Sequence, residues 1–254
     1  MTEVTPAPLT SAPEAATILR AVARAPQFSW QRGWHIVCDG DDWLVLASDE
    51  PGCLTQAQAI SAGSATELLV QARERAGRRS TVELLPAEIA RCVVAVRDAG
   101  PGPGGRARDL LDAREGVAGR ALTMSDARHL NLAAETFGCE LLWQDSSDPR
   151  LLSPGLRRLH ATADRRPLTT LVTRGDGPRD WLHAGRAAAL CSLVAADLGL
   201  ALVFGVHPFN GWATREEIRQ VWELEGWPQL QFTLVEPTVT TLPAGASDPT
   251  PLPE

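Results

Sequence analysis

Lysine and tyrosine are both absent from this chain of 254 residues, and their absence excludes several kinds of chemistry. Without lysine, the protein cannot form a Schiff base with a substrate or with pyridoxal phosphate, and it cannot contain a Walker-type phosphate loop. Without tyrosine, it has no phenolic general acid. All 24 basic residues are arginine, so any anion must be bound by arginine, by backbone N–H groups or by a helix N-terminus.

Sequence patterns for metal and serine-hydrolase chemistry are missing as well. The five histidines are dispersed and no HExxH or CxxC pattern is present, so we expect no metal site. No GxSxG motif occurs, which argues against a serine hydrolase of that type. The five cysteines are an odd number without close pairs, and we expect them to be reduced and mostly buried.

The charge and hydropathy of the chain limit which kinds of partner it is expected to bind. The net charge is −7 and the arginines are scattered, which argues against binding to nucleic acid. No apolar run reaches the roughly 18 residues of a membrane span, and the first residues lack the basic start and apolar stretch of a signal peptide. We therefore expect a cytoplasmic protein, monomeric or homodimeric, that does not bind membranes and takes a small-molecule substrate.

Helical and strand patterns alternate along the chain and predict an α+β fold with a central β-sheet flanked by helices. Helices are expected over residues 11–26, 54–77, 125–138, 180–200 and 213–228. A hairpin is expected over 34–48, and further strands over 80–86, 89–97, 139–144, 168–173 and 230–236.

Two of these helices differ in their apolar pattern. The helix over 54–77 reads as amphipathic, whereas the helix over 180–200 is apolar nearly all round and should be the buried central helix. Asp180 is the expected N-cap of that second helix. Thr214 and Glu217 are spaced as a capping box for the helix that follows.

The chain divides into two halves of similar layout, joined by the glycine-rich segment DAGPGPGGRA at 98–107. A phosphate cradle is the alternative for this segment, but it lacks lysine and does not fit the GxGxxG pattern. We interpret it as a linker between an N-terminal half, 11–97, and a C-terminal half, 108–236. Residues 1–10 and the proline-rich tail 237–254 are expected to be disordered. No residue-by-residue repeat relates the halves, so fused half-units are a hypothesis.

The loop FGVHPFNGW at 204–212 suits a planar ligand because it combines aromatic rings, an amide and a glycine. Ordinary hydrophobic packing of the loop is the alternative. The residues concerned are Gly205, His207, Phe209, Asn210 and Trp212.

Residues 167–235 contain a series of short motifs in a fixed order. WL-x-AG opens a long helix of small residues, a glycine ends it, a helix with an IR element follows, and G-x-PQ precedes the last strand. An IS-x-G-x-A helix stands in the first half. The positions are Ile60, Ser61, Gly63, Ala65, Trp181, Leu182, Ala184, Gly185, Gly199, Ile218, Arg219, Gly226, Pro228 and Gln229. In these motifs the chain resembles the flavin-dependent nitroreductase family, and most closely its actinobacterial Acg-type branch.

The resemblance implies a nitroreductase-like fold, FMN as cofactor, and two-electron transfer from NAD(P)H to a small-molecule acceptor. Acg-type chains resemble two family protomers fused in one polypeptide, which suits the two halves. Some members of this branch look better suited to holding flavin than to turning over substrate. The alternative is therefore a non-catalytic relative that holds flavin, or has lost it, and acts through partner binding.

The stretch APQFSWQRGW at 25–34 lies where the family carries AP-S-x-x-N-x-QPW. Ala25, Pro26 and Trp34 match, whereas the serine, asparagine and QP positions hold other residues. Polar neighbours could supply replacement hydrogen bonds to the flavin. The candidate cofactor-binding residues are Gln27, Ser29, Gln31, Arg32, Ser61, Arg114, Arg120 and Gly205. No catalytic side chain is assigned.

Arg114 and Arg120 precede a predicted helix, where they could clamp a phosphate, although solvation is the commoner role of a surface pair. In the resemblance they are what remains of the family's RR-[ST]-x-R motif. Glu236 stands where the family has an arginine near the end of the last strand, and a carboxylate there would repel a phosphate.

Overall fold

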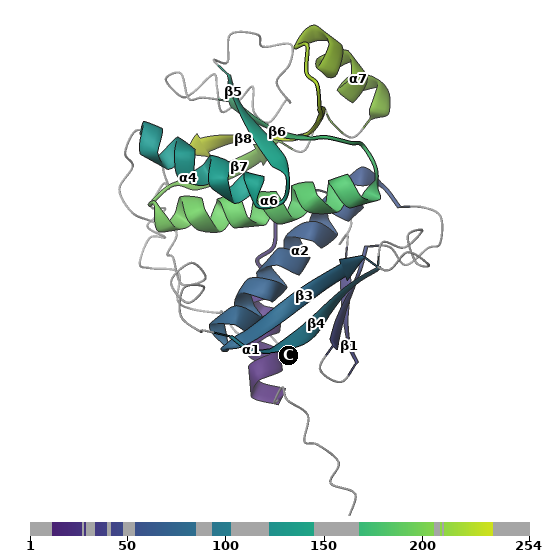
Figure 1. Ribbon diagram of the computed structural model, residues 1–254, viewed down its shortest axis with the longest axis vertical. Helices are drawn as coiled ribbons and strands as arrows, with labels where there is room; N and C mark the ends of the chain where they lie inside the picture. Colours follow the sequence, from purple (N-terminus) through teal and green to yellow (C-terminus); the bar gives the residue numbers. More distant parts are fainter. Residues whose placement is uncertain are drawn as a thin grey trace, which may run out of the picture.

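The computed structural model describes residues 12–26, 28, 34–39, 42–47, 54–84, 93–102, 122–144, 168–205, 209 and 211–235. Within these residues the helices are α1 (Ala12–Val22), α2 (Gln56–Arg75), α4 (Met124–Glu135), α6 (Pro178–Asp197) and α7 (Trp212–Val221) (Figure 1). The strands are β1 (His35–Asp39), β2 (Asp42–Leu46), β3 (Arg78–Leu84), β4 (Val93–Pro101), β5 (Cys139–Gln144), β6 (Leu168–Thr173), β7 (Ala201–Gly205) and β8 (Trp227–Val235).

The strands form two four-stranded antiparallel sheets instead of the single central sheet expected from the sequence. The first sheet has the order β1-β2-β4-β3 and the second has the order β5-β6-β8-β7. In each half a helix precedes the first strand, and a helix of 20 residues, α2 or α6, joins the second strand to the third. The two halves therefore share the strand order of their sheets and the place of the long helix, and the second half has α7 between β7 and β8. The two long helices lie between the sheets (Figure 1).

Both long helices contribute to two hydrophobic cores, one beside each sheet. Ile60 of α2 packs in the core of the second half, whereas Leu182 and Ala189 of α6 pack in the core of the first half. α2 is buried at every position from Ala59 to Val70, so the amphipathic prediction for it was wrong. Its surroundings explain this, because α2 is covered by α6 as well as by the first sheet.

The two long helices cross at a pair of glycines. A Cβ atom on Gly63 would overlap the carbonyl oxygen of Leu182, and a Cβ atom on Gly185 would overlap the carbonyl oxygen of Ile60. Ser64 reinforces the contact, since its hydroxyl donates to the carbonyl oxygen of Gly185 at 2.9 Å. The backbones can approach this closely only because neither glycine has a side chain.

Two helix starts differ from the sequence prediction. The N-cap of α6 is Gly177, and Asp180 lies at the third helical position, where its Oδ2 accepts the Gly177 N–H at 3.1 Å. α7 has Gly211 as its N-cap, so Thr214 lies inside the helix and does not cap it. The predicted ends Gly77, Gly138 and Gly199 follow their helices with positive φ angles of 78°, 67° and 72°.

The segment expected to be a linker begins inside β4. Residues 98–101 belong to this strand, and Asp98 accepts from Arg73 at 2.8 Å and from Arg78 at 3.0 Å. The hydrogen bond from Arg78 lowers the pKa of the Asp98 carboxyl. These contacts fix the start of the segment, while residues 103–107 lie outside the described residues, as do 1–10 and 237–254.

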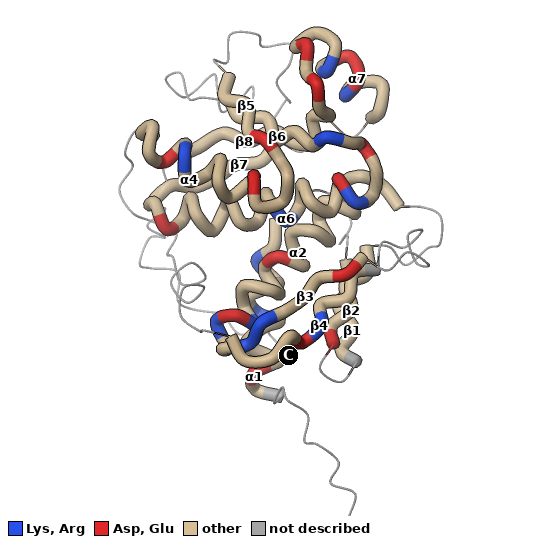
Figure 2. Tube along the Cα trace, in the orientation of Figure 1, with Lys and Arg blue, Asp and Glu red and all other residues tan. Residues whose placement is uncertain are grey.

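Charged residues of both signs are interleaved along α7 and near the ends of the first sheet, so the view in Figure 2 shows no face of a single sign. Among the described residues, no helix combines the length and the apolar character needed to cross a membrane.

Candidate functional site

Six of the eight predicted cofactor-binding residues lie outside the part of the chain that the structure describes: Gln27, Ser29, Gln31, Arg32, Arg114 and Arg120. The other two, Ser61 on α2 and Gly205 at the end of β7, are both buried. Gly205 was expected in a loop, but β7 includes it and pairs it with Gln231 of β8. Of the other candidates in the 204–212 loop, His207 and Asn210 are not described.

Phe28 connects the 25–34 stretch to both Ser61 and β7. Its backbone N–H donates to Ser61 Oγ at 2.9 Å, and its ring meets that of Phe204 edge-on, with 5.2 Å between the centroids. Phe204 in turn contacts Phe232 of β8 at 5.6 Å. Phe28 is only 4% exposed and belongs to the core of the second half. The stretch thus runs from the first half of the chain onto the second.

Ser61 supports the backbone of this stretch. Its hydroxyl donates to the carbonyl oxygen of Ala57 at 2.7 Å and accepts from Phe28, and no part of Ser61 is exposed to solvent. A hydroxyl has one proton to donate, and here it is already engaged within the helix. Ser61 therefore fixes where Phe28 lies.

Trp34, at the other end of the same stretch, packs against the core of the first half. Its indole N–H is buried and has no hydrogen-bond partner among the described residues. A buried donor without a hydrogen-bond acceptor costs on the order of 1–3 kcal/mol of folding free energy. A ligand that placed an acceptor here would recover part of this cost.

A buried polar network centres on Arg215 of α7, and sequence reasoning did not identify it. Arg215 of α7, only 3% exposed, donates from Nη1 to Gln56 Oε1 and to the carbonyl oxygen of Phe209, both at 2.7 Å. Its Nη2 donates to Asp176 Oδ2 at 2.8 Å. Arg215 thereby ties together α7, the start of α2 and the turn before α6.

Two residues from the sequence motifs complete this network. Gln229 accepts from Gln56 at 2.6 Å and donates to Thr173 Oγ1 at 2.7 Å, while Trp181 Nε1 donates to Asp176 Oδ1 at 2.7 Å. Gln229 of the G-x-PQ motif therefore carries a structural hydrogen bond between the two halves, while Trp181 of the WL-x-AG motif bonds to the turn before its own helix. Their spacing in the sequence did not reveal this, because the partners come from five separate segments.

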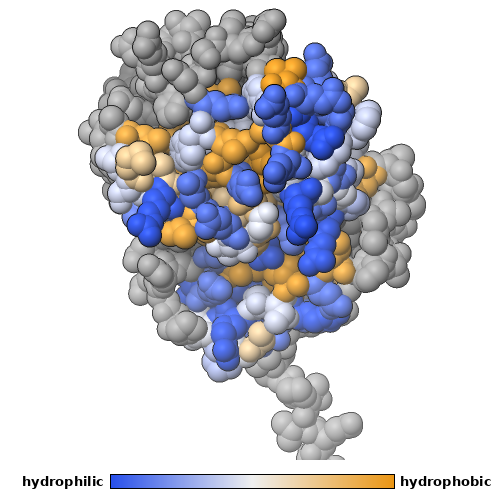
Figure 3. Space-filling model, turned by 45° about the horizontal axis from the view of Figure 1, so that its top comes forward, coloured by the Kyte–Doolittle hydropathy of each residue, from blue (hydrophilic) through white to orange (hydrophobic). Residues whose placement is uncertain are grey.

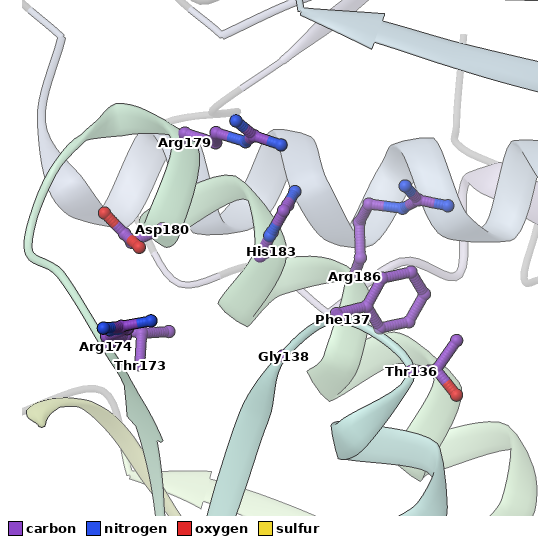
Figure 4. A pocket seen from close by; sticks show the side chains of 9 residues that line it. All are labelled: Thr136, Phe137, Gly138, Thr173, Arg174, Arg179, Asp180, His183 and Arg186. Carbon is purple, nitrogen blue, oxygen red and sulfur yellow. The ribbon is translucent and has the colours of Figure 1, made fainter.

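A cavity of about 840 Å³ opens where the ends of α4 and β6 meet the start of α6 (Figure 4). We call it the α6 pocket. It is lined by Thr136, Phe137, Gly138, Thr173, Arg174, Arg179, Asp180, His183 and Arg186. Three guanidinium groups and one imidazole thus face a single cavity.

Arg186 is held in place on two sides. It donates to Glu67 of α2 at 2.8 and 3.0 Å, and its guanidinium lies 4.4 Å from the centre of the Phe137 ring. Burial lowers the pKa of His183, and the positive charges of Arg179 and Arg186 lower it further. Both effects favour the neutral form of the imidazole.

Arg174 and Arg179 are exposed at the pocket, and within the described residues neither forms an ion pair. Asp180 also lines the cavity, but its Oδ2 is engaged by the N–H of Gly177. The pocket therefore has a positive balance of charge. The sequence carried a signal for it that our reasoning missed: Arg179, His183 and Arg186 recur at helical spacing on one face.

No protein-family model matches the sequence, and no match was found among curated proteins. A crystal structure named as an NADH dehydrogenase/NAD(P)H nitroreductase from Bacteroides thetaiotaomicron aligns with 55% of this chain and 92% of its own, at 15% identity and a TM-score of 0.40. Similarity this low does not by itself support a conclusion about function. The described residues belong to a mixed α/β protein with two antiparallel sheets.

Proposed function

We propose that this protein is an FMN-dependent oxidoreductase of the nitroreductase type, which uses NAD(P)H to reduce a small-molecule acceptor. The observation that supports this most is the meeting of the segments on which the sequence resemblance rests. Phe28 of the 25–34 stretch rests on Ser61 of the IS-x-G-x-A helix, and that helix crosses the WL-x-AG helix at Gly63.

The described residues fit a flavin through shape and anchoring. Phe28, Phe204 and Phe232 form an aromatic wall in which Phe204 is only partly buried, and the hydrogen bond to Ser61 fixes the backbone at Phe28. Trp34 offers an unmet buried donor in the same stretch. When bound, FMN supplies the hydride chemistry, so no catalytic acid or base is required of the chain. In this proposal Gln27, Ser29, Gln31 and Arg32 make the direct polar contacts with the flavin.

The shared strand order of the two halves supports the further proposal that the chain consists of two fused half-units. In this proposal the flavin lies where the halves meet, because the 25–34 stretch starts in one half and packs on the other. Arg114 and Arg120 would bind the phosphate.

The test is flavin retention and reduction. Protein incubated with FMN and desalted should keep the visible flavin absorbance, and NADH or NADPH should bleach it. Replacing both Arg114 and Arg120 with alanine should weaken binding of FMN much more than that of riboflavin, which lacks the phosphate. Equal weakening of both ligands would remove these arginines from the phosphate-binding role.

The second candidate is a non-catalytic relative that holds flavin, or has lost it, and acts through partner binding. It is favoured by Ser61, whose single proton is engaged by Ala57, and by the exchanged polar residues of the 25–34 stretch. Bound FMN that neither nicotinamide reduces would support the flavin-holding form, and absence of retained flavin the other. Apolar areas on the face in Figure 3 alternate with hydrophilic ones.

A further inference from the structure

We propose that the α6 pocket binds the phosphate group of a small molecule, held between Arg179 and Arg186 above His183. This site is separate in its residues from the flavin contacts proposed above, and the inference does not depend on them.

The three side chains share one face of α6. Arg179, His183 and Arg186 are spaced i, i+4 and i+7, which places them in line along a helix. Figure 4 shows their nitrogen-bearing ends on the same side of the helix, with Asp180 directed away from them. Two guanidinium groups therefore flank one imidazole without a carboxylate between them.

The two arginines differ in how they are held. Arg186 is positioned in advance by Glu67 and by the Phe137 ring, so binding requires little further ordering of it. Arg179 is exposed and forms no ion pair within the described residues, so its donors are available to a ligand. One guanidinium group is fixed and the other is available, and in this proposal both contact a single anion.

The chemistry of the lining favours phosphate over carboxylate. A phosphate has three terminal oxygens and can bridge two guanidinium groups, whereas a carboxylate is satisfied by one bidentate arginine. The imidazole of His183 lies between the two guanidinium groups and adds a positive charge there when it is protonated. The cavity of about 840 Å³ lies within the roughly 300–1,000 Å³ typical of small-molecule sites, and Phe137 offers an apolar surface for the rest of the ligand.

The first experiment measures pyrophosphate binding by isothermal titration calorimetry at constant ionic strength. Wild-type protein should bind, and Arg179→Gln should weaken binding about tenfold, as loss of a charge-assisted contact would. R179K should lose less, because the charge remains. His183→Gln is a second variant that leaves both guanidinium groups in place and should weaken binding moderately. The matched control is R128Q, which removes an exposed arginine of α4 that does not line the pocket.

Three results would overturn the proposal: no detectable pyrophosphate binding, equal weakening by R128Q and R179Q, or citrate binding as tightly as pyrophosphate with the same dependence on Arg179. Circular dichroism confirms that each variant is folded.

A competition experiment identifies the source of the phosphate. Displacement of pyrophosphate by FMN but not by riboflavin would assign the pocket to the flavin phosphate, and no displacement would assign it to a separate phosphorylated ligand.

Discussion

His183 shows how one residue of a short motif acquires a role from its surroundings. It occupies the variable position of WL-x-AG, yet it is half-buried between Arg179 and Arg186. The motif alone predicts a helix start and a close helix contact. The positive environment of the imidazole comes from neighbours on the next turns and could be inferred only by plotting the helix face.

The lowered pKa of His183 predicts how stability depends on pH. Because its pKa is lower in the folded protein than in the unfolded chain, the unfolded chain binds more protons near pH 6.5, so folding is weakened as the pH falls from 7 through this range. His183→Gln should remove this component. Urea midpoints of both proteins between pH 7.5 and 5 would show it as a smaller loss of stability in the variant.

The control for this experiment is H129Q, which replaces an exposed histidine of α4. It should follow the wild-type pH dependence. If the urea midpoints of wild type and H183Q fell in parallel with pH, the lowered pKa of His183 would not be the cause of the pH dependence.

For the cysteines and Ser61, the sequence predicted the environment or the role of the side chain only in part. The sequence predicted buried thiols, and Cys139 and Cys191 are buried, but Cys38 is exposed. Burial raises the pKa of the Cys139 thiol to about 12, which keeps it protonated and unreactive. Ser61 stays a predicted cofactor residue, although its hydrogen bonds point to a supporting role.

At the scale of elements, the crossing of α2 and α6 depends on Gly63 and Gly185. Each glycine faces a carbonyl group of the other helix, and a backbone atom cannot rotate away as a side chain can. Substitution by alanine therefore has to move one whole helix against two cores.

Gly63→Ala should lower the free energy of unfolding by about 3 kcal/mol, in the upper part of the range for overpacked cores. Higher helix propensity offsets at most about 1 kcal/mol of that effect. The control is G138A, where φ is 67° and no atom lies within 4 Å of the added Cβ, so only left-handed strain of about 1–2 kcal/mol is expected. Urea denaturation measures both, and a G63A cost no larger than that of G138A would count against the crossing as described.

Sequence patterns predicted elements well where one local signal decides them. β5 and β6 begin and end at the predicted residues, 139–144 and 168–173, and the hairpin of β1 and β2 is confirmed. β7 was missed, because its five residues follow a helix end directly and look like a continuation of the loop. The burial of α2 was missed because its polar residues Glu67 and Arg73 are satisfied by distant partners.

At the scale of the whole molecule, the halves are joined through shared cores and buried polar contacts. α2 and α6 each pack in both cores, and Glu67 of the first half pairs with Arg186 of the second while only 3% of its side chain is exposed. We therefore expect the two halves to unfold together.

Glu67→Ala should lower the free energy of unfolding by roughly 3–5 kcal/mol, as expected when one partner of a buried pair is removed. Hydrogen exchange measured by mass spectrometry should show reduced protection in β2 and β4 and an equal reduction in β6 and β8. Loss of protection confined to one sheet would mean that the halves open separately.

The α+β class followed from the alternation of patterns, but the pair of sheets could not be predicted. Which strands share a sheet depends on pairing between distant segments, such as β6 with β8, and no local pattern encodes it. The nitroreductase resemblance rests on motif residues such as Gln229, whose buried partners Gln56 and Thr173 lie in other segments and were visible only in three dimensions.

The glycine crossing also has a genetic consequence. Because the atom opposite each glycine is main chain, no change of side chain on the facing helix can make room for a larger residue. After either glycine is replaced, a second substitution on the facing helix therefore cannot restore the close approach of the two backbones. We therefore expect homologous chains to keep both glycines together.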